Sequence, residues 1–246
     1  MTSLRRPARW TATILAGITA AVWIYLLTGA AGMPGMTASG GMIMMQTAWT
    51  AGDATLALVM WATMMAAMML PSAAHTIVQV GPGGVAQAMY FTAGYLLMWT
   101  AFGLAATLAQ WGLDAAHLLS DAMAIKSAVI TGALVAAIGI YQLTPMKRRC
   151  LRHCRASDSD RDRADGRGAW KTVRQGLRYG VSCVGCCGAA MLLLFVGDVM
   201  SLVWVAAIGL WAFVERRLPW GDRIAQLTAA GLLAWGIVAL ATAAPG

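Results

Sequence analysis

The sequence predicts an all-α fold, a polytopic bundle of about seven transmembrane helices. Of its 246 residues, 59% are apolar and only 11% are charged, whereas soluble domains average about 45–50% apolar and about 25% charged residues. The apolar residues form runs close to the roughly 20 residues that a helix needs to cross a bilayer. Because too few polar residues remain to cover a soluble core of this size, we expect an integral membrane protein.

Breaks in the apolar runs divide the chain into the expected spans. The first, at 10–28, exceeds the roughly 7–15 residues of a signal-peptide core, so we expect it to be retained, with a cleaved signal peptide as the alternative. The other expected spans are 54–70 ending at Pro71-Ser72, 86–111 after the glycine-rich loop 81–84, 122–143 ending at Thr144-Pro145, two within 177–218 that break at Gly197-Asp198, and 224–243.

Basic residues predict the orientation. If the spans alternate, seventeen of the eighteen Lys and Arg residues fall on one side, within 5–9, 146–178 and 215–223, and the exception is Lys126. The positive-inside rule makes that side cytoplasmic. We therefore expect a multi-pass protein of a bacterial inner membrane with a cytoplasmic N-terminus. The net charge of +8 then reflects orientation, and we expect no nucleic-acid partner.

Cysteines gather in two short segments. Cys183, Cys186 and Cys187 open the fifth expected span. Residues three and four apart share one face of a helix, so these sulfurs are expected to lie together. Gly185 and Gly188 remove bulk beside them, which lets an ion or a second backbone approach. Cys150 and Cys154 are also four apart, in the expected cytoplasmic segment.

The second expected span carries the densest of the methionine clusters. Met60, Met64 and Met68 form an i, i+4, i+8 row, and His75 follows the span. In the predicted topology this span and the fourth both end inside, where the fifth begins, so the sulfur residues are expected to converge at the cytoplasmic interface. The predicted metal ligands are Cys183, Cys186, Cys187, Cys150, Cys154, Met64, Met65, Met68, Met69 and His75.

Soft ligands predict a soft ion. Thiolates and thioethers select Cu(I) above all. Zinc and iron–sulfur clusters are the alternatives, because both bind thiolates, but neighbouring methionines favour copper. The same residues also have ordinary explanations, since methionine commonly fills helix packing. Disulfide exchange is disfavoured because the cytosol keeps thiols reduced and five cysteines leave one unpaired.

Taken together, these motifs resemble the bacterial family of predicted metal-binding integral membrane proteins. That family was long catalogued as a domain of unknown function, and some members are described as membrane copper chaperones. The matching residues are Met64-Met65-Ala66-Ala67-Met68-Met69-Leu70-Pro71-Ser72, Tyr141-Gln142-Leu143-Thr144-Pro145-Met146-Lys147 with Cys150 and Cys154, and Cys183-Val184-Gly185-Cys186-Cys187 followed by Met191-Leu192.

Two positions depart from the family pattern. Relatives tend to carry His-Gly shortly before the cysteine cluster, where this chain has Tyr179-Gly180, and often tryptophan after the paired cysteines, where it has Gly188. If that histidine is a ligand in relatives, this chain either lacks it or substitutes another group, for which His153 and His75 are the candidates.

The expected function is that of a Cu(I) chaperone or handling protein that assists copper delivery. Its expected partners are the lipid bilayer and a cuproenzyme or copper carrier. The alternatives are a secondary transporter or channel for a soft metal ion, and a structural or assembly subunit without metal. The sequence contains no Walker loop and no hydrolytic constellation, so we expect no enzyme. The expected regions are a first transmembrane helix or signal anchor at 1–29, a Met/Gly-rich external loop at 30–53, and a six-helix metal-binding membrane domain at 54–246 with a cytoplasmic loop at 146–176.

Overall fold

The computed structural model describes residues 5–31, 49–80, 84–120, 123–156, 168–197, 199, 201–218 and 220–243. Within these ranges the chain is helical, joined by turns and one isolated β-bridge between Leu119 and Ile125. The expected all-α class is therefore confirmed. The helices are α1 (Arg5–Ala31), α3 (Ala51–Val80), α4 (Val85–Ala115), α5 (Ala128–Leu143), α6 (Pro145–Ala156), α7 (Ala169–Met191) with the 3₁₀ turn η2 (Leu192–Phe195), α8 (Leu202–Arg217) and α9 (Gly221–Ala243).

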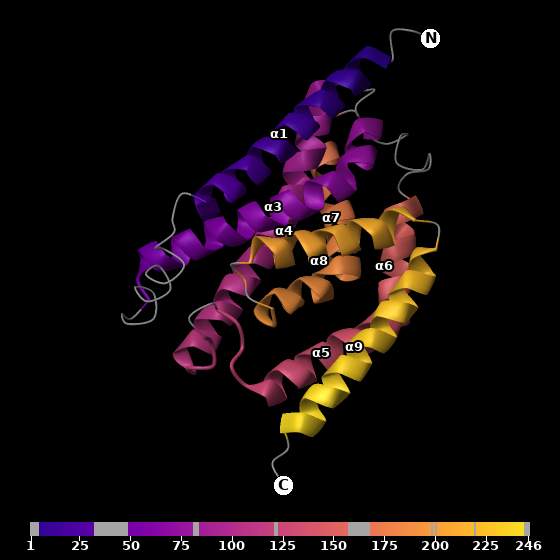
Figure 1. The fold of residues 1–246 in the computed structure, drawn as a ribbon. Helices are drawn as coiled ribbons and strands as arrows, with labels where there is room; N and C mark the ends of the chain where they lie inside the picture. Colours follow the sequence, from indigo (N-terminus) through magenta and orange to yellow (C-terminus); the bar gives the residue numbers. More distant parts are fainter. Residues whose placement is uncertain are drawn as a thin grey trace.

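The helices form two groups that meet at α6, α7 and α8 (Figure 1). In the first group α3 packs against α1, α4 and α8, and α4 packs along α7. In the second group α5 pairs with α9. The crossing of α4 and α7 is very close, because a Cβ atom on Gly94 would meet the Val173 carbonyl and one on Gly176 would meet the Phe91 carbonyl. This contact fixes α7, which carries three of the cysteines, against the centre of the first group.

Several helices are long and apolar enough to cross a membrane. Four meet this criterion in the described part of the chain: α3, α4, α7 extended through Phe195, and α9. The pair α5 and α6, bent by 61°, makes a fifth if it counts as one broken span. Helix α8 has 16 residues, fewer than the roughly 20 that span a bilayer. The expected number of seven and the expected orientation stay predictions.

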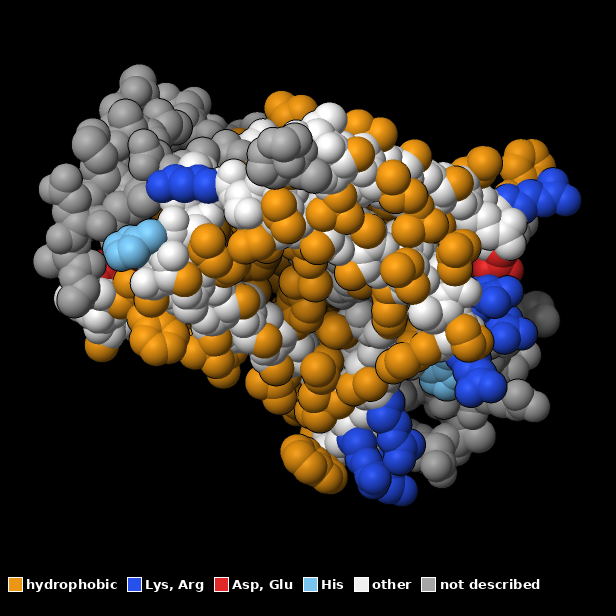
Figure 2. Space-filling view, turned by 90° about the horizontal axis from the view of Figure 1, so that it is seen from below, with side chains coloured by type: hydrophobic (Ala, Val, Ile, Leu, Met, Phe, Trp, Pro, Cys, Tyr) orange, Lys and Arg blue, Asp and Glu red, His pale blue; other side chains and the backbone are white. Residues whose placement is uncertain are grey.

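The molecular surface carries many exposed apolar side chains, as expected for a protein embedded in a membrane. Figure 2 shows apolar side chains over the middle of one face, with most Lys and Arg side chains of that face towards one end. Exposed large apolar side chains include Val203, Leu227 and Ile237. Contiguous apolar surface of this extent is rare on soluble monomers.

Pro71 does not end a helix, contrary to the sequence prediction. It lies inside α3, which continues to Val80. Proline removes the backbone donor that would otherwise bond the carbonyl of Ala67, but this single loss does not end the helix. The Met69 carbonyl nearby accepts two side-chain hydrogen bonds. Ser72 Oγ donates to the Met69 carbonyl (2.9 Å), and the Tyr95 hydroxyl donates to the same carbonyl (3.2 Å). The extension carries His75 beyond the methionine cluster to an exposed position.

The segment predicted as the cytoplasmic loop 146–176 contains helical structure at both ends. Helix α6 occupies Pro145–Ala156 and α7 begins at Ala169. Thr144 starts α6, because its Oγ1 accepts a hydrogen bond from the Lys147 amide (3.3 Å) and proline is favoured in a first helical turn. Lys147, Leu151 and Cys154 are buried, at a spacing that places them on one face. The charged middle of this segment, 157–167, and the methionines of 30–53 lie outside the described residues.

Candidate metal centre

Helix α7 holds three buried thiols around one point. Cys183, Cys186 and Cys187 have their Sγ atoms within 4.8 Å of one another. The Sγ atoms of Cys186 and Cys187 lie 3.2 Å apart. Two sulfurs that bind one ion at about 2.3 Å each lie at most about 4.6 Å apart. The three thiols can therefore reach a shared ion with only small movements of their side chains.

Helix α6 adds the other two cysteines. Cys154 is buried, and its Sγ lies 3.8 Å from that of Cys186. Cys150, one turn earlier, is half-buried. It fits against α7 because Gly185 has no side chain there, and a Cβ atom at Gly185 would lie 2.7 Å from Cys150 Sγ. The five thiols form no disulfide bond, and they run from a half-buried position on α6 to fully buried positions on α7.

Two side chains of α6 anchor it to the end of α8. Lys147 Nζ and Glu215 Oε1 form a buried ion pair at 2.5 Å. Arg155 Nη2 donates to the carbonyls of Glu215 (2.6 Å) and Leu218 (2.9 Å). Burial raises the pKa of the Glu215 carboxyl above its ordinary value, although the charge of Lys147 opposes that shift. These contacts hold the α6 thiols over the α7 thiols.

Cys183 lies beside a buried cation. Arg216 of α8 donates from Nη1 to Cys183 Sγ (3.0 Å) and to Ser72 Oγ (2.6 Å), and from Nη2 to the Tyr179 hydroxyl (2.6 Å). The Tyr95 hydroxyl lies 3.3 Å from the same sulfur. A neighbouring positive charge stabilises a thiolate, which is the form of cysteine that binds metal.

The family model PpoB2, described as a copper chaperone, matches residues 58–239. This chain belongs to that copper chaperone family. The resemblance expected from the sequence motifs is confirmed, and the matched residues include every cysteine of the centre. No curated protein and no solved structure matches the chain.

The donor set fits the cargo that the family description implies. Thiolates are ligands that soft ions such as Cu(I) prefer. Cys183, Cys186 and Cys187 are each at most 5% exposed, so the centre is shielded from water. The part of the chain that the structure describes offers one group of three His, Cys, Asp or Glu ligand atoms close enough to share an ion, and these three cysteines form it.

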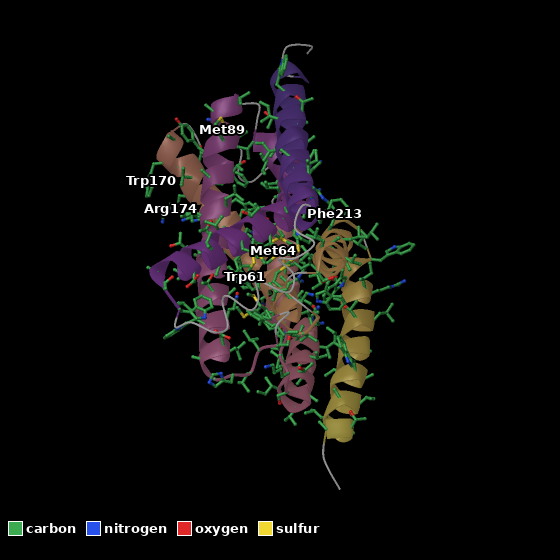
Figure 3. The ribbon with its side chains drawn as sticks, turned by 60° about the vertical axis from the view of Figure 1, so that its left-hand side comes forward. Trp61, Met64, Met89, Trp170, Arg174 and Phe213 are labelled. Atoms are coloured by element: carbon green, nitrogen blue, oxygen red, sulfur yellow. The ribbon has the colours of Figure 1, made fainter. Side chains whose placement is uncertain are left out.

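The methionines of α3 lie in the core of this copper chaperone family member. Met64, Met65, Met68 and Met69 are each at most 4% exposed, and Figure 3 shows Met64 with Trp61 near the centre of the molecule. Met68 packs over Gly209 of α8, where an added Cβ would lie 3.1 Å from Met68 Cγ. Their packing is sufficient to explain these methionines as core residues. Contact between their thioethers and copper stays a prediction.

Neither candidate histidine belongs to the group of described ligand atoms close enough to share an ion, and metal binding by either stays a prediction. His75 and His153 are both exposed, and Nδ1 of His75 lies 3.2 Å from Nε2 of Gln79. Tyr179, at the position where relatives tend to carry histidine, instead reaches the centre through Arg216.

Sequence reasoning did not assign Arg216, Tyr95 or Tyr179 to the centre. Arg216 was counted only among the basic residues of the 215–223 turn. A Glu-Arg pair at the end of an otherwise apolar helix was the available signal, because ionisable residues in apolar segments commonly face the interior of a bundle.

Proposed function

We propose that this protein is a membrane copper chaperone that holds Cu(I) on the thiolates of Cys183, Cys186 and Cys187. The observation that carries the proposal is the continuous series of thiols. It begins at half-buried Cys150, continues at Cys154, 3.8 Å from Cys186, and ends at the three buried sulfurs of α7. The family description supports the choice of copper.

Ligand exchange is the chemistry that this series supports. A Cu(I) ion held by two thiolates accepts a third before it releases the first, so one copper–sulfur bond forms as another breaks. The sulfur of Cys186 lies near those of both Cys154 and Cys187, which makes Cys186 the bridge between α6 and α7. No electron is transferred, and copper stays in its reduced state throughout.

The membrane setting is part of the proposal. We place α3, α4, α7, α9 and the bent pair α5–α6 across a bacterial inner membrane, with α6 towards the cytoplasm. Their length and composition support this placement. Helix α8 then returns the chain from the outer end of α7 to the cytoplasmic start of α9, which lies beside α6. In this arrangement a copper carrier reaches Cys150 from the cytoplasm, and a cuproenzyme is the recipient. The domain at 54–246 would then be the metal-binding unit, preceded by the helix at 1–29 and the loop at 30–53.

Cysteine labelling tests the orientation. Single cysteines placed at exposed Arg152 and at exposed His117, in a chain whose native cysteines are serines, are treated in intact cells with a membrane-impermeant thiol reagent. We expect His117→Cys to react from outside and Arg152→Cys only after lysis. The opposite pattern would refute the proposed side of the copper entrance.

Metal analysis of the purified protein tests the copper centre itself. Wild type loaded with Cu(I) is compared with a Cys183→Ser/Cys186→Ser/Cys187→Ser variant, and Ser182→Ala serves as a control because it alters a neighbouring half-buried side chain. We expect X-ray absorption to show copper with sulfur neighbours in wild type and in the control, and loss of tightly bound copper in the triple variant. Equal copper content in all three would exclude this centre.

A flux measurement separates a chaperone from a transporter. Proteoliposomes that contain the wild-type protein are expected to bind Cu(I) without accumulating it in the lumen, with or without a proton gradient. Gradient-dependent accumulation would instead establish a secondary transporter.

A further inference from the structure

Exposed basic side chains of α7 form a line that leads to the outermost thiol. Lys171, Arg174 and Arg178 are exposed, and their spacing of three and four residues places them on one face of the helix. Gly185 follows Arg178 by seven residues, close to two full turns, so it continues the same face. Cys150 of α6 packs on this glycine, where an added Cβ would lie 2.7 Å from Cys150 Sγ. The line of positive charge therefore ends at the half-buried thiol with which the series of cysteines begins.

Helix α6 adds further positive charge beside that thiol. Arg148, Arg149 and Arg152 are exposed. Two of them donate hydrogen bonds to backbone carbonyls, Arg148 from Nη2 to Leu143 (3.3 Å) and Arg152 from Nε to Arg148 (3.4 Å). Figure 3 shows Arg174 of α7 at the edge of the molecule. The side chains of both helices together are the basic entrance surface, which consists of Arg148, Arg149, Arg152, Lys171, Arg174 and Arg178.

The basic entrance surface lacks a matching set of acids. In the described part of the chain, no ion pair joins any of its side chains to a carboxylate. At this end of the molecule Glu215 is buried in its pair with Lys147, whereas Asp222 at the start of α9 is exposed. The described surface around Cys150 therefore has a large excess of positive charge.

Membrane orientation and lipid contact do not account for this arrangement. The positive-inside rule requires basic residues on the cytoplasmic side, but it does not require them to share a helix face with a thiol. Lys171 and Arg178 lie about 10 Å apart along the helix axis, whereas the headgroup layer on one side of a bilayer is only about 5–7 Å deep. In the proposed membrane placement, a line of charge of that length extends past the lipid headgroups. It fits better a protein surface that approaches from the cytoplasm.

We propose that the basic entrance surface docks an acidic protein segment that carries Cu(I) and guides its metal to Cys150. This inference rests on the proposed copper chaperone function. Cu(I) held by two thiolates forms a complex with a single negative charge, so the metal site of the carrier is itself anionic. During transfer the Cys150 sulfur bonds to copper and releases its proton to water, while one carrier sulfur leaves copper and takes up a proton. Complementary charge of this kind acts mainly on the rate of encounter.

Copper transfer from synthetic peptides to the full chain in nanodiscs of zwitterionic lipid tests the proposal. One peptide holds Cu(I) on a Cys-x-x-Cys pair flanked by Asp and Glu, and its match has Asn and Gln at those positions. Each carries a fluorophore whose emission reports bound Cu(I), so rapid mixing gives the second-order rate constant of transfer. The variants are Arg174→Glu on α7 and Arg149→Glu on α6. Lys126→Glu is the control, because it makes the same change in net charge at an exposed residue outside the basic entrance surface.

At low ionic strength, wild type should take copper from the acidic peptide at least about tenfold faster than from the neutral peptide. High salt should abolish this advantage, because it screens exposed charges. Arg174→Glu and Arg149→Glu should each remove most of the advantage and leave the rate from the neutral peptide within about threefold of wild type. Lys126→Glu should leave both rates within about threefold.

Equal rates from the two peptides with wild type would overturn the proposal, and this comparison does not depend on any variant. An effect of Lys126→Glu as large as that of Arg174→Glu would also overturn it, because net charge would then be the cause. Loss of the advantage in nanodiscs that contain phosphatidylglycerol would show that lipid headgroups occupy the surface, again against the proposal. Failure of the proposed function looks different, because wild type would then take copper from neither peptide.

Discussion

The contact between Gly185 and Cys150 allows a sharp test of how α6 sits on α7. Gly185→Ala adds one methyl group, whose carbon would lie 2.7 Å from Cys150 Sγ and 3.4 Å from Cys150 Cβ. The first distance is too short for an ordinary contact, whereas the second is tolerable. Overpacking of this kind costs about 1–3 kcal/mol, while replacing a mid-helix glycine with alanine gains about 0.5–1 kcal/mol. The net expectation is a loss of about 1 kcal/mol.

Removing the sulfur should reverse the sign of this effect. In a Cys150→Ala background the nearest atom to the new methyl group is the Cβ at 3.4 Å. Gly185→Ala should then be neutral or stabilising by up to about 1 kcal/mol. The coupling free energy between the two substitutions should be about 1–3 kcal/mol, within the range of residues in direct contact.

The assay is unfolding of the purified protein in mixed micelles, followed by loss of helicity, for wild type, both single variants and the double variant. Gly231→Ala is the control, because it lies inside α9 and an added Cβ there meets no atom within 4 Å. It should show only the gain from helix propensity. If Gly185→Ala changes the free energy of unfolding equally with and without the Cys150 sulfur, the described contact between α6 and α7 is wrong.

Two further substitutions probe the elements that hold the centre together. Lys147→Met should reduce the free energy of unfolding by about 3–5 kcal/mol, because it leaves Glu215 buried without its partner, and adding Glu215→Gln should recover most of the loss. If the double variant is as unstable as Lys147→Met alone, the loss of stability does not come from leaving Glu215 unpaired. Gly176→Ala should destabilise the protein by at least about 2 kcal/mol, since the new methyl group would overlap the Phe91 carbonyl of α4, and thermal unfolding beside Gly231→Ala measures this. Equal stability of those two variants would show that the α4–α7 crossing is looser than described.

Sequence patterns correctly predicted features that depend on residues close together in the chain. The spacing of Cys183, Cys186 and Cys187 predicted a shared helix face, and their sulfurs do lie together. The break near Gly197 separates α7 and η2 from α8 as expected. Pro71 was misread as a helix end, because a proline removes only one helical hydrogen bond and the local sequence does not show that α3 packs against α4 and α8 on both sides of it. Helix α6 was missed because its many charges obscured the buried positions of Lys147, Leu151 and Cys154.

The predicted topology brought the two cysteine segments to the same end of the bundle, but direct contact between distant residues depended on packing. The 3.8 Å approach of Cys154 to Cys186 depends on the anchoring of α6 to α8 by Lys147 and Glu215. The inward direction of Arg216 depends on Ser72 and Tyr179, which lie 144 and 37 residues away in sequence. The acidic residue before Arg216 marks this end of the helix, but it does not show that Arg216 points inward while Arg217 is only partly buried.

By itself, the amino-acid sequence determined that this chain is helical, strongly apolar and equipped with soft sulfur ligands at helical spacing. Composition and the 3.6-residue period of a helix are local properties, so both can be recognised without knowing which helices are in contact. The tertiary structure decided which helices meet and which charge lies inside. These helices carry apolar residues on most of their faces, so hydrophobic periodicity does not show which face packs against protein. That choice was made by the glycines at the close crossings and by the buried polar contacts around Cys183.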